Sequence, residues 1–269
     1  MTDGAGRARR WRTALVTGAS SGIGDAFARC LAAEGSDLVV VARDGERLDV
    51  LAEELTAAHG VSVEVLPADL GAPVARHAVE QRLASRDRTV DLLVNNAGFG
   101  TNGTFHEMSV DREEQEVQVN ALALLRLTHA ALGPMVARGS GHVLNVASIG
   151  GLDPIPGSAT YGATKAFVCS FGDAVHEELR GSGVHLTTSL PGFTRTEFQE
   201  RSHWEGQEGL PGFAWLTAEE VARQSLDGVW AGRARVVPAR RYQLLTAATA
   251  PVPPFLKRLI MGRAQDVAW

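Results

Sequence analysis

The chain has 269 residues, of which 45% are hydrophobic and 21% charged, a composition typical of globular proteins that excludes an intrinsically disordered chain. Its formal net charge of −5 gives no overall positive field for nucleic acid, and no apolar run approaches the roughly 18 to 20 residues that span a bilayer. We therefore expect no nucleic-acid partner and no membrane span.

The N-terminal end and the cysteines bear on cellular location. Residues 1–11 form a basic arm that we expect to be flexible, and they lack the apolar core of a secretory signal. Cys30 and Cys169 lie in expected helices without the spacing of metal ligands. No second ligand at such a spacing accompanies three histidines, His142, His176 and His185. These features indicate a cytoplasmic protein with reduced thiols and no metal site.

Short β-branched apolar runs alternate with longer segments rich in Ala, Leu, Glu and Arg from residue 12 to about 190. Strands are expected at Thr13–Thr17, Asp37–Ala42, Ser62–Pro67, Asp91–Asn95, His142–Ala147, Val184–Leu190 and, less typically, Arg235–Val237. Helices are expected at residues 21–35, 45–59, 72–86, 109–138, 158–182 and 217–231. The alternation predicts one doubly wound, Rossmann-type α/β domain over residues 12–240, a parallel sheet with helices on both faces.

The alternation ends after the sixth strand. Residues 193–216 combine glycine and proline with five aromatic residues, which indicates an irregular substrate loop over a site. Residues 241–269 are expected to form a C-terminal helical appendage with an amphipathic helix over Pro251–Met261. That helix could touch a membrane surface, cover the active site or pack on a partner subunit.

A glycine-rich turn follows the first strand directly. The segment Thr17–Gly24 carries Gly18, Gly22 and Gly24 and leads into a helix. Glycines let the backbone turn tightly and approach a pyrophosphate, while the helix N-terminus offers unpaired N–H groups and the positive end of its dipole. The Gly-x-x-x-Gly-x-Gly spacing differs from the commoner dinucleotide fingerprint, but its place after the first strand favours dinucleotide binding.

The end of the second strand bears on the choice of dinucleotide. An acidic residue there would bind the ribose 2′-hydroxyl of NAD, whereas this chain has Arg43, which can clamp a 2′-phosphate. Asp44 is interpreted as the cap of the next helix. The sequence therefore favours NADP(H) over NAD(H).

Tyr161 and Lys165 carry the main signal for chemistry. Positions four apart share a helix face, so the Lys165 ammonium is expected to lie near Tyr161 and to lower its pKa toward working pH. Ser148 ends a strand thirteen residues earlier. Singly, each of these residues is more often structural.

The acidic run Glu113–Glu116, near the start of the helix that follows Ser109, is interpreted as a solvated face that complements the helix dipole.

Together these residues resemble the short-chain dehydrogenase/reductase family over about residues 12 to 195. Several further motifs match in the right order, namely Asp69-Leu70, Asn95-Asn96-Ala97-Gly98, Asn120, and Pro191-Gly192 followed by Thr194 and Thr196. The resemblance implies that Ser148 holds the substrate oxygen and that Tyr161 exchanges a proton with it. Lys165 would lower the tyrosine pKa and bind the nicotinamide ribose, and Asn120 would hold a water that links Lys165 to solvent.

The resemblance also implies roles in cofactor binding. Asp69 and Leu70 would contact the adenine, Asn96 the cofactor backbone, and Thr194 with Thr196 the nicotinamide amide and the phosphates, while Asn95 is structural. The expected cofactor-binding residues are Gly18, Ser20, Ser21, Gly22, Ile23, Gly24, Arg43, Asp69, Leu70, Asn96, Ala97, Gly98, Tyr161, Lys165, Pro191, Gly192, Thr194 and Thr196.

Apolar side chains dominate the loops that determine substrate choice in this family, here Phe99, Ile149, Leu152, Pro154, Ile155, Phe193 and the aromatic residues of 198–215. We expect a hydrophobic ketone or aldehyde and its alcohol, of ketoacyl, steroid-like or terpenoid type. A 3-oxoacyl-thioester reductase and a non-catalytic NADP(H)-sensing protein are the alternatives. The resemblance favours a homodimer or homotetramer formed through helices 109–138 and 158–182.

Overall fold

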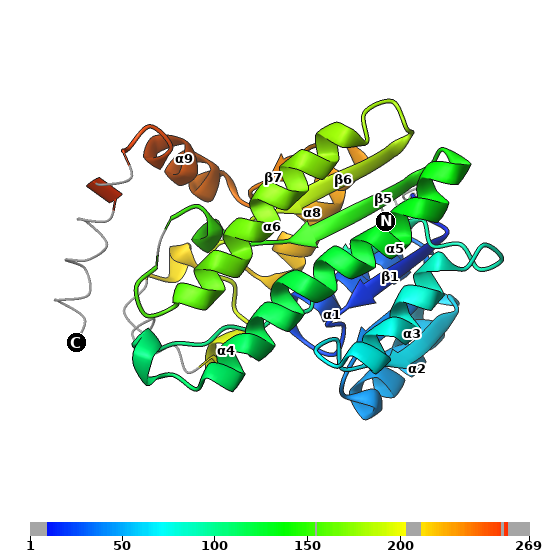
Figure 1. Ribbon diagram of the computed structural model, residues 1–269. Coiled ribbons are helices and arrows are strands. Elements are labelled where there is room, and N and C mark those ends of the chain that lie inside the picture. Colours follow the sequence, from blue (N-terminus) through cyan, green and yellow to red (C-terminus); the bar gives the residue numbers. More distant parts are fainter. Residues whose placement is uncertain (1–9, 154, 203–210, 254–255, 258–269) are drawn as a thin grey trace, which may run out of the picture.

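Seven parallel strands form one sheet in the computed structural model, which describes residues 10–153, 155–202, 211–253 and 256–257. Their order is β3-β2-β1-β4-β5-β6-β7 (Figure 1). The strands are β1 (Thr13–Thr17), β2 (Asp37–Ala42), β3 (Val63–Pro67), β4 (Leu92–Asn95), β5 (Gly141–Val146), β6 (Val184–Ser189) and β7 (Arg235–Val236). The expected doubly wound α/β fold is confirmed.

The central strands are apolar because both of their faces are covered. Leu15 of β1 pairs with Val39 of β2 on one side and with Leu93 of β4 on the other, and all three are buried. A strand buried on both faces has no polar side to alternate with. The continuous apolar runs in the sequence follow from this placement.

Helices cover the sheet in two layers. On one face lie α1 (Gly22–Ala33), α2 (Gly45–His59) and α8 (Ala218–Trp230). On the other lie α3 (Pro73–Ala84), α5 (Leu124–Arg138) and α6 (Ala159–Glu178), as Figure 1 shows. Each expected helix is present, and the parallel strands bring the loops at their carboxyl ends to one edge of the sheet.

The expected helix 109–138 is one continuous helical stretch with a change of winding in its middle. It consists of α4 (Val110–Val117), the π-helical turn η2 (Gln118–Ala123) and α5. It is long enough for a membrane span, and an 18-residue window within it has a mean hydropathy of 1.3. Leu127, Ala131 and Met135 instead pack in the core beneath the sheet, as expected for a core helix of this fold.

The N-terminal arm becomes ordered before its expected end. Trp11 is only 2% exposed, and its Nε1 donates to His142 Nδ1 at 3.1 Å. Arg10 donates to Asp227 of α8 at 2.9 Å and lies 5.9 Å from the Trp230 ring. Residues 1–9 lie outside the described part of the chain. The expectation of a flexible arm is therefore wrong for residues 10 and 11, because an indole and a guanidinium find partners on the fold.

The C-terminal region also differs from expectation. Helix α9 (Arg240–Thr249) follows β7 directly, and its Tyr242 is buried against the substrate loop. Pro251–Pro253 are not helical, whereas Leu256 and Lys257 are. The rest of the expected Pro251–Met261 helix lies outside the described residues. At least its first part is therefore not a helix, and α9 belongs structurally with the domain.

Candidate active site

The carboxyl ends of the parallel strands bring the expected site residues to one edge of the sheet. Thr17 ends β1, Asn95 ends β4, and Val146 ends β5 just before Ser148. Because β6 pairs in parallel with β5, the segment after Ser189 joins the same edge. This edge is where ligands bind in open α/β sheets.

The glycine turn has the geometry of an anion cradle. Gly18 and Gly22 adopt left-handed conformations, with φ of 67° and 58°, that L-residues with side chains rarely take. A Cβ on Gly24 would overlap the Gly18 carbonyl oxygen, so the turn closes on itself only with glycine there. Ser21, the N-cap of α1, uses its side chain for no cap hydrogen bond. The N-terminus of α1 therefore fits the pyrophosphate of a dinucleotide.

Thr17 and Asn96 tie this turn to the loop after β4. The Thr17 hydroxyl accepts from the backbone N–H groups of Asn96 and Ala97 at 2.9 and 3.0 Å, and Asn96 Nδ2 donates to the Thr17 carbonyl at 3.0 Å. Asn95 points the other way and donates to Thr128 and Asn145, each at 3.0 Å. Asn96 thus supports the cradle, and Asn95 is placed as the structural residue it was expected to be. The sequence analysis did not single out Thr17.

The segment after β6 closes the other side of the cradle. A Cβ on Gly22 would lie 3.1 Å from the Thr196 side chain, so Thr196 sits against the N-terminus of α1. Thr194 donates to the Gly192 carbonyl at 2.9 Å, and the Pro191 carbonyl accepts from Ile149 N at 3.0 Å. The expected residues after β6 are therefore brought beside those after β1 and β5.

Arg43 and Asp44 occupy the end of β2 as the sequence placed them. Arg43 is exposed there. Asp44 is the N-cap of α2 and accepts from Arg47 N at 3.1 Å, so the cap interpretation is confirmed. An exposed guanidinium at this strand end, with the neighbouring carboxylate engaged in capping, suits a 2′-phosphate.

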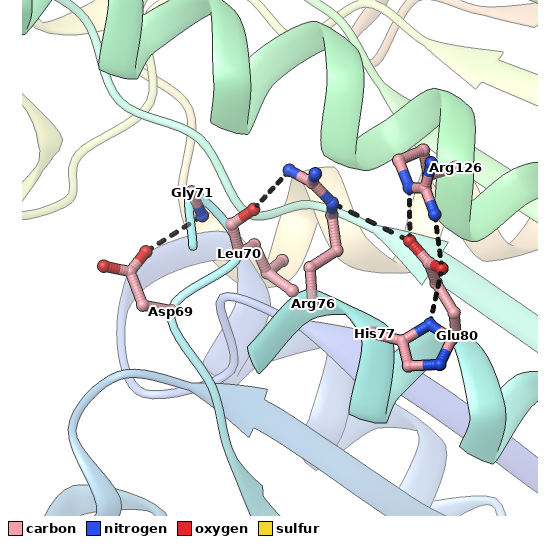
Figure 2. A network of polar contacts seen from close by, with 7 residues as sticks. All are labelled: Asp69, Leu70, Gly71, Arg76, His77, Glu80 and Arg126. Atoms are coloured by element: carbon pink, nitrogen blue, oxygen red, sulfur yellow. Dashed lines mark hydrogen bonds and ion pairs between the residues drawn. The ribbon is translucent and has the colours of Figure 1, made fainter. Parts of the chain in front are cut away.

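The loop expected to contact adenine is braced from beneath. Asp69 Oδ1 accepts from Gly71 N at 2.9 Å, and the Leu70 carbonyl accepts from Arg76 Nη1 at 3.1 Å (Figure 2). Arg76 is buried at the start of α3. Its guanidinium therefore fixes the backbone on which the two expected adenine contacts stand.

A carboxylate links this brace to α5. Arg126 of α5 donates to both oxygens of Glu80 at 2.5 and 2.8 Å, and Arg76 Nε lies 3.7 Å from the same carboxylate (Figure 2). Hydrogen bonding by Arg126, and then by His77, holds the pKa of Glu80 below its usual value against the effect of burial. The sequence analysis missed these residues, because nothing in their spacing joins α3 to a helix 46 positions away.

Tyr161 lies buried beside Ser148 at the core of the site. A Cβ on Gly150 would lie 3.3 Å from Ser148 Oγ and 3.7 Å from Tyr161 Cε1, so both side chains border the same glycine. Burial raises the pKa of Tyr161 to about 12, although a hydrogen bond with Ser148 acts to lower it. The structure thus brings the expected acid/base and the expected oxygen-binding hydroxyl together.

The Lys165 ammonium is directed at the backbone of β5. Its Nζ donates to the Val146 carbonyl at 3.0 Å and lies 5.7 Å from the centre of the Tyr161 ring. Burial lowers the pKa of Lys165 itself to about 8. The pKa of Tyr161 is raised rather than lowered here, because burial of the phenol is the largest effect on it.

Asn120 sits in the π-helical turn and clamps the loop after β4. Its Nδ2 donates to the Phe99 carbonyl at 2.8 Å and its Oδ1 accepts from Phe99 N at 3.1 Å. The same Nδ2 lies 3.2 Å from Thr164 Oγ1 of α6. The side chain of Asn120 therefore joins η2, the loop and α6 behind Tyr161.

The acidic run before Asn120 is not a uniformly solvated face, and that interpretation is wrong for half of it. Glu113 is 7% exposed and Glu116 is fully buried, whereas Glu114 and Gln115 face solvent. Residues three apart share a helix face, so the spacing of Glu113 and Glu116 indicates that both lie on one side of α4, which composition alone does not reveal.

Two pairs of aromatic rings involve the segment after β6, and one of them includes Tyr161. The Phe198 ring of α7 (Phe198–Arg201) lies 5.6 Å from the Tyr161 ring, and Phe193 pairs with Trp215 at 5.9 Å. Phe213 is exposed, while Pro154 and Trp204 lie outside the described residues.

Among the described residues, no group of three or more His, Cys, Asp or Glu side chains is placed to hold a metal ion.

Known proteins share both the sequence and the architecture of this chain. A family described as short chain dehydrogenase matches residues 12–206. The NADP-dependent 3-hydroxy acid dehydrogenase YdfG of Salmonella typhi is 38% identical over 226 residues, which cover 80% of this chain and 86% of the relative.

Two solved structures extend the likeness to three dimensions. A short-chain dehydrogenase from Sphingobium yanoikuyae in complex with NADPH matches with a TM-score of 0.80 and 38% identity, over 88% of this chain and 93% of its own. A bulky-bulky ketone specific alcohol dehydrogenase from Comamonas testosteroni matches with a TM-score of 0.77 and 34% identity, over 89% and 92%.

The glycine cradle generates a direct prediction. Replacing Gly24 with alanine should raise the Kd for NADPH at least about tenfold, a loss of roughly 1.4 kcal/mol, because the added methyl group meets backbone that cannot move aside. Gly133→Ala in α5, where a Cβ meets no atom within 4 Å, is the matched control. Fluorescence titration with NADPH measures both, and equal affinities for the two variants would contradict this account of the turn.

Proposed function

This chain belongs to the short-chain dehydrogenase family and is an NADP(H)-dependent oxidoreductase acting on CH–OH donors, and we propose that it interconverts a hydrophobic ketone or aldehyde and its alcohol. The observation that carries the proposal is the buried Tyr161 beside the half-buried Ser148, with the Phe198 ring 5.6 Å from the Tyr161 ring. A buried tyrosine beside a serine hydroxyl suits proton transfer to a carbonyl oxygen.

The chain's own residues handle the proton and the substrate oxygen. Bound NADPH supplies the hydride. In reduction, the Ser148 hydroxyl holds the substrate oxygen and the Tyr161 hydroxyl donates its proton to that oxygen as the carbonyl carbon is reduced. A phenol with a pKa of about 12 is protonated at neutral pH, which is the form that can donate. Oxidation of the alcohol requires the reverse transfer, for which a lower tyrosine pKa is needed.

Lys165 and Asn120 complete the proposed machinery behind Tyr161. Lys165 would bind the nicotinamide ribose and, once drawn toward it, lower the tyrosine pKa. Asn120 keeps η2 and the loop after β4 in place through its two hydrogen bonds to Phe99. A water held there would link Lys165 to solvent. The completeness of this set favours an enzyme over a non-catalytic NADP(H)-sensing protein, which would not need the acid/base.

The remaining expected cofactor contacts are assigned by their place around the cradle. Ser20, Ser21 and Ile23 stand at the turn and the N-terminus of α1, where backbone N–H groups would receive the phosphates. Arg43 would pair with the 2′-phosphate. The other expected contacts lie in the loops after β3, β4 and β6, namely Asp69, Leu70, Asn96, Ala97, Gly98, Pro191, Gly192, Thr194 and Thr196.

The substrate side of the site favours an apolar compound. Phe198 presents a ring rather than a charge beside Tyr161, Phe193 and Trp215 pair in the segment after β6, and a solved relative of 34% identity is specific for bulky ketones. Arg195 and Arg112 are turned onto aromatic rings, at 5.3 Å from Trp215 and 4.2 Å from Phe99. A 3-oxoacyl thioester is the alternative substrate, because either arginine could instead bind the negatively charged carrier of such a thioester.

A homodimer or homotetramer is the assembly that the surface supports. Apolar side chains of α4, η2 and α6 line an open hollow with Phe105 on the outside of the molecule, and they include Val117, Ala121, Ala163 and Phe167. Phe105 and Phe167 are exposed, and Phe167 stacks on Phe171 at 5.7 Å. Exposed apolar patches of this kind often mark subunit interfaces.

A cytoplasmic location remains an expectation of the sequence.

The acid/base role predicts a specific loss. Tyr161→Phe should lower kcat for reduction of apolar ketones at least about 100-fold, the usual contribution of a positioned acid, while NADPH binding stays within about threefold of wild type. Loss of NADPH absorbance measures turnover and fluorescence titration measures binding. A variant with unchanged kcat would overturn the role of Tyr161, and faster turnover of small polar sugars than of any apolar ketone would overturn the substrate class.

Arg43 predicts a change in cofactor selection. Arg43→Ala should weaken NADPH binding about 10- to 100-fold, as expected for a lost hydrogen-bonded charge pair, and leave NADH binding unchanged. Arg180→Ala, which removes an exposed guanidinium paired with Glu177 just beyond α6, is the control for charge alone. Equal losses for the two cofactors would show that Arg43 does not contact the 2′-phosphate.

A further inference from the structure

Glu116 is a fully buried carboxylate directly behind the proposed machinery. Its Oε2 accepts from Thr101 N at 3.0 Å and from Thr101 Oγ1 at 2.7 Å. Its Oε1 lies 3.4 Å from Asn120 Nδ2. One acid therefore contacts both the loop after β4 and the asparagine that clamps that loop.

A second carboxylate and one cation face Glu116 from the elements around it. Glu113 lies one turn earlier on α4, accepts from Thr160 of α6, and has a buried Oε1 without a hydrogen-bond partner. Lys165 of α6 borders the same glycine as Asn120, because a Cβ on Gly98 would lie 3.5 Å from Lys165 Nζ and 2.9 Å from Asn120 Oδ1. Tyr161, on the same helix as Lys165, is within electrostatic reach of Glu116. The loop after β4 contributes Thr101, which is polar but does not titrate.

These surroundings place the carboxyl where it titrates near neutral pH. Burial raises the pKa of Glu116, the Thr101 hydroxyl lowers it, Glu113 raises it and Lys165 lowers it, with a resulting value of about 7. Its charge acts in turn on the pair on α6. The carboxylate raises the pKa of Lys165 against the effect of burial and also raises the pKa of Tyr161.

We propose that Glu116 is a positioning residue whose carboxylate keeps Lys165 charged and so extends turnover to higher pH. The inference rests on the proposed function, because it needs Lys165 and Tyr161 to act in the reaction. As the anion, Glu116 stabilises the ammonium of Lys165 across Asn120. As the neutral acid, it keeps its contacts with Thr101 and Asn120 but withdraws that support.

The test compares Glu116→Gln with Glu114→Gln. Both changes remove one negative charge from α4 and are close to isosteric, but Glu114 is exposed to solvent and Glu116 is buried. Rates of NADPH oxidation are recorded from pH 5.5 to pH 9.5 with the bulky apolar ketone that wild type reduces fastest. Tyr161→Phe is measured alongside.

The expected result is a change in the shape of the profile. Below pH 6, where Glu116 is largely protonated, the rate of Glu116→Gln should match that of wild type. On the alkaline side, the rate of Glu116→Gln should fall at a pH about one unit lower than that of wild type, as expected from removing a charge several ångströms from Lys165. Glu114→Gln should follow wild type throughout. A uniformly lower rate with an unchanged profile would indicate a structural role and overturn the inference.

A stability measurement tests the titration without substrate. The carboxyl binds its proton more tightly in the folded chain, at about 7, than at its ordinary value of 4.5, so wild type should lose stability relative to Glu116→Gln as pH rises through that window. Urea midpoints of the two proteins should therefore diverge between pH 5 and pH 7 and then stay apart.

The two kinds of failure are distinguishable. Parallel urea midpoints, or divergent midpoints with identical rate profiles, would overturn the role of Glu116 and leave the reductase intact. Turnover by Tyr161→Phe equal to that of wild type would overturn the proposed chemistry, and the inference with it.

Discussion

The parallel direction of all the sheet strands is the constraint on which the rest of the structure depends. It forces each connection to cross back over a face as a helix, and it places every carboxyl end at one edge. The glycine turn after β1, the asparagines after β4, Ser148 after β5 and the threonines after β6 meet for this reason. No long-range attraction between these polar residues is needed to assemble the site.

Once assembled, the site is held in place by hydrogen bonds between polar groups that are largely shielded from water. Thr17 and Asn96 fix the cradle, and Asn120 fixes the loop beside Tyr161. Asn120 projects from the π-helical turn η2, and such turns are frequent at functional sites. Burial then alters the proton affinities of Tyr161, Lys165 and Glu116, so the packing that builds the site also determines its chemistry.

Much of this was accessible from the sequence because it follows from local periodicity. Runs such as Leu38–Val41 identify strands buried on both faces, and the spacing of Tyr161 and Lys165 identifies a shared helix face. The features that were missed depend on tertiary partners. Trp11 is ordered by His142, and the direction of the Lys165 ammonium is set by the carbonyl of Val146.

Two further misses show the limits of reading charge and helical pattern alone. Glu116 is buried because α4 turns it toward Thr101, although its neighbours in the acidic run face solvent. Helix α9 lies almost wholly in the segment expected to be helical, but the amphipathic helix was expected further along, at Pro251–Met261. The N-cap of α9, Ala239, has a positive φ, and its Leu244 and Leu245 face solvent. It is stabilised instead by Tyr242, whose hydroxyl donates to the Ala214 carbonyl at 2.6 Å.

The central claim is that this edge of the sheet aligns a carbonyl carbon with the hydride of NADPH while Tyr161 protonates the oxygen. The most direct measurement follows deuterium from the hydride-donating carbon of labelled NADPH into the product alcohol by mass spectrometry. The account predicts one deuterium on the carbinol carbon and none at that carbon when unlabelled NADPH is used in heavy water. Product without cofactor-derived label, or with solvent deuterium on that carbon, would contradict direct transfer at this site.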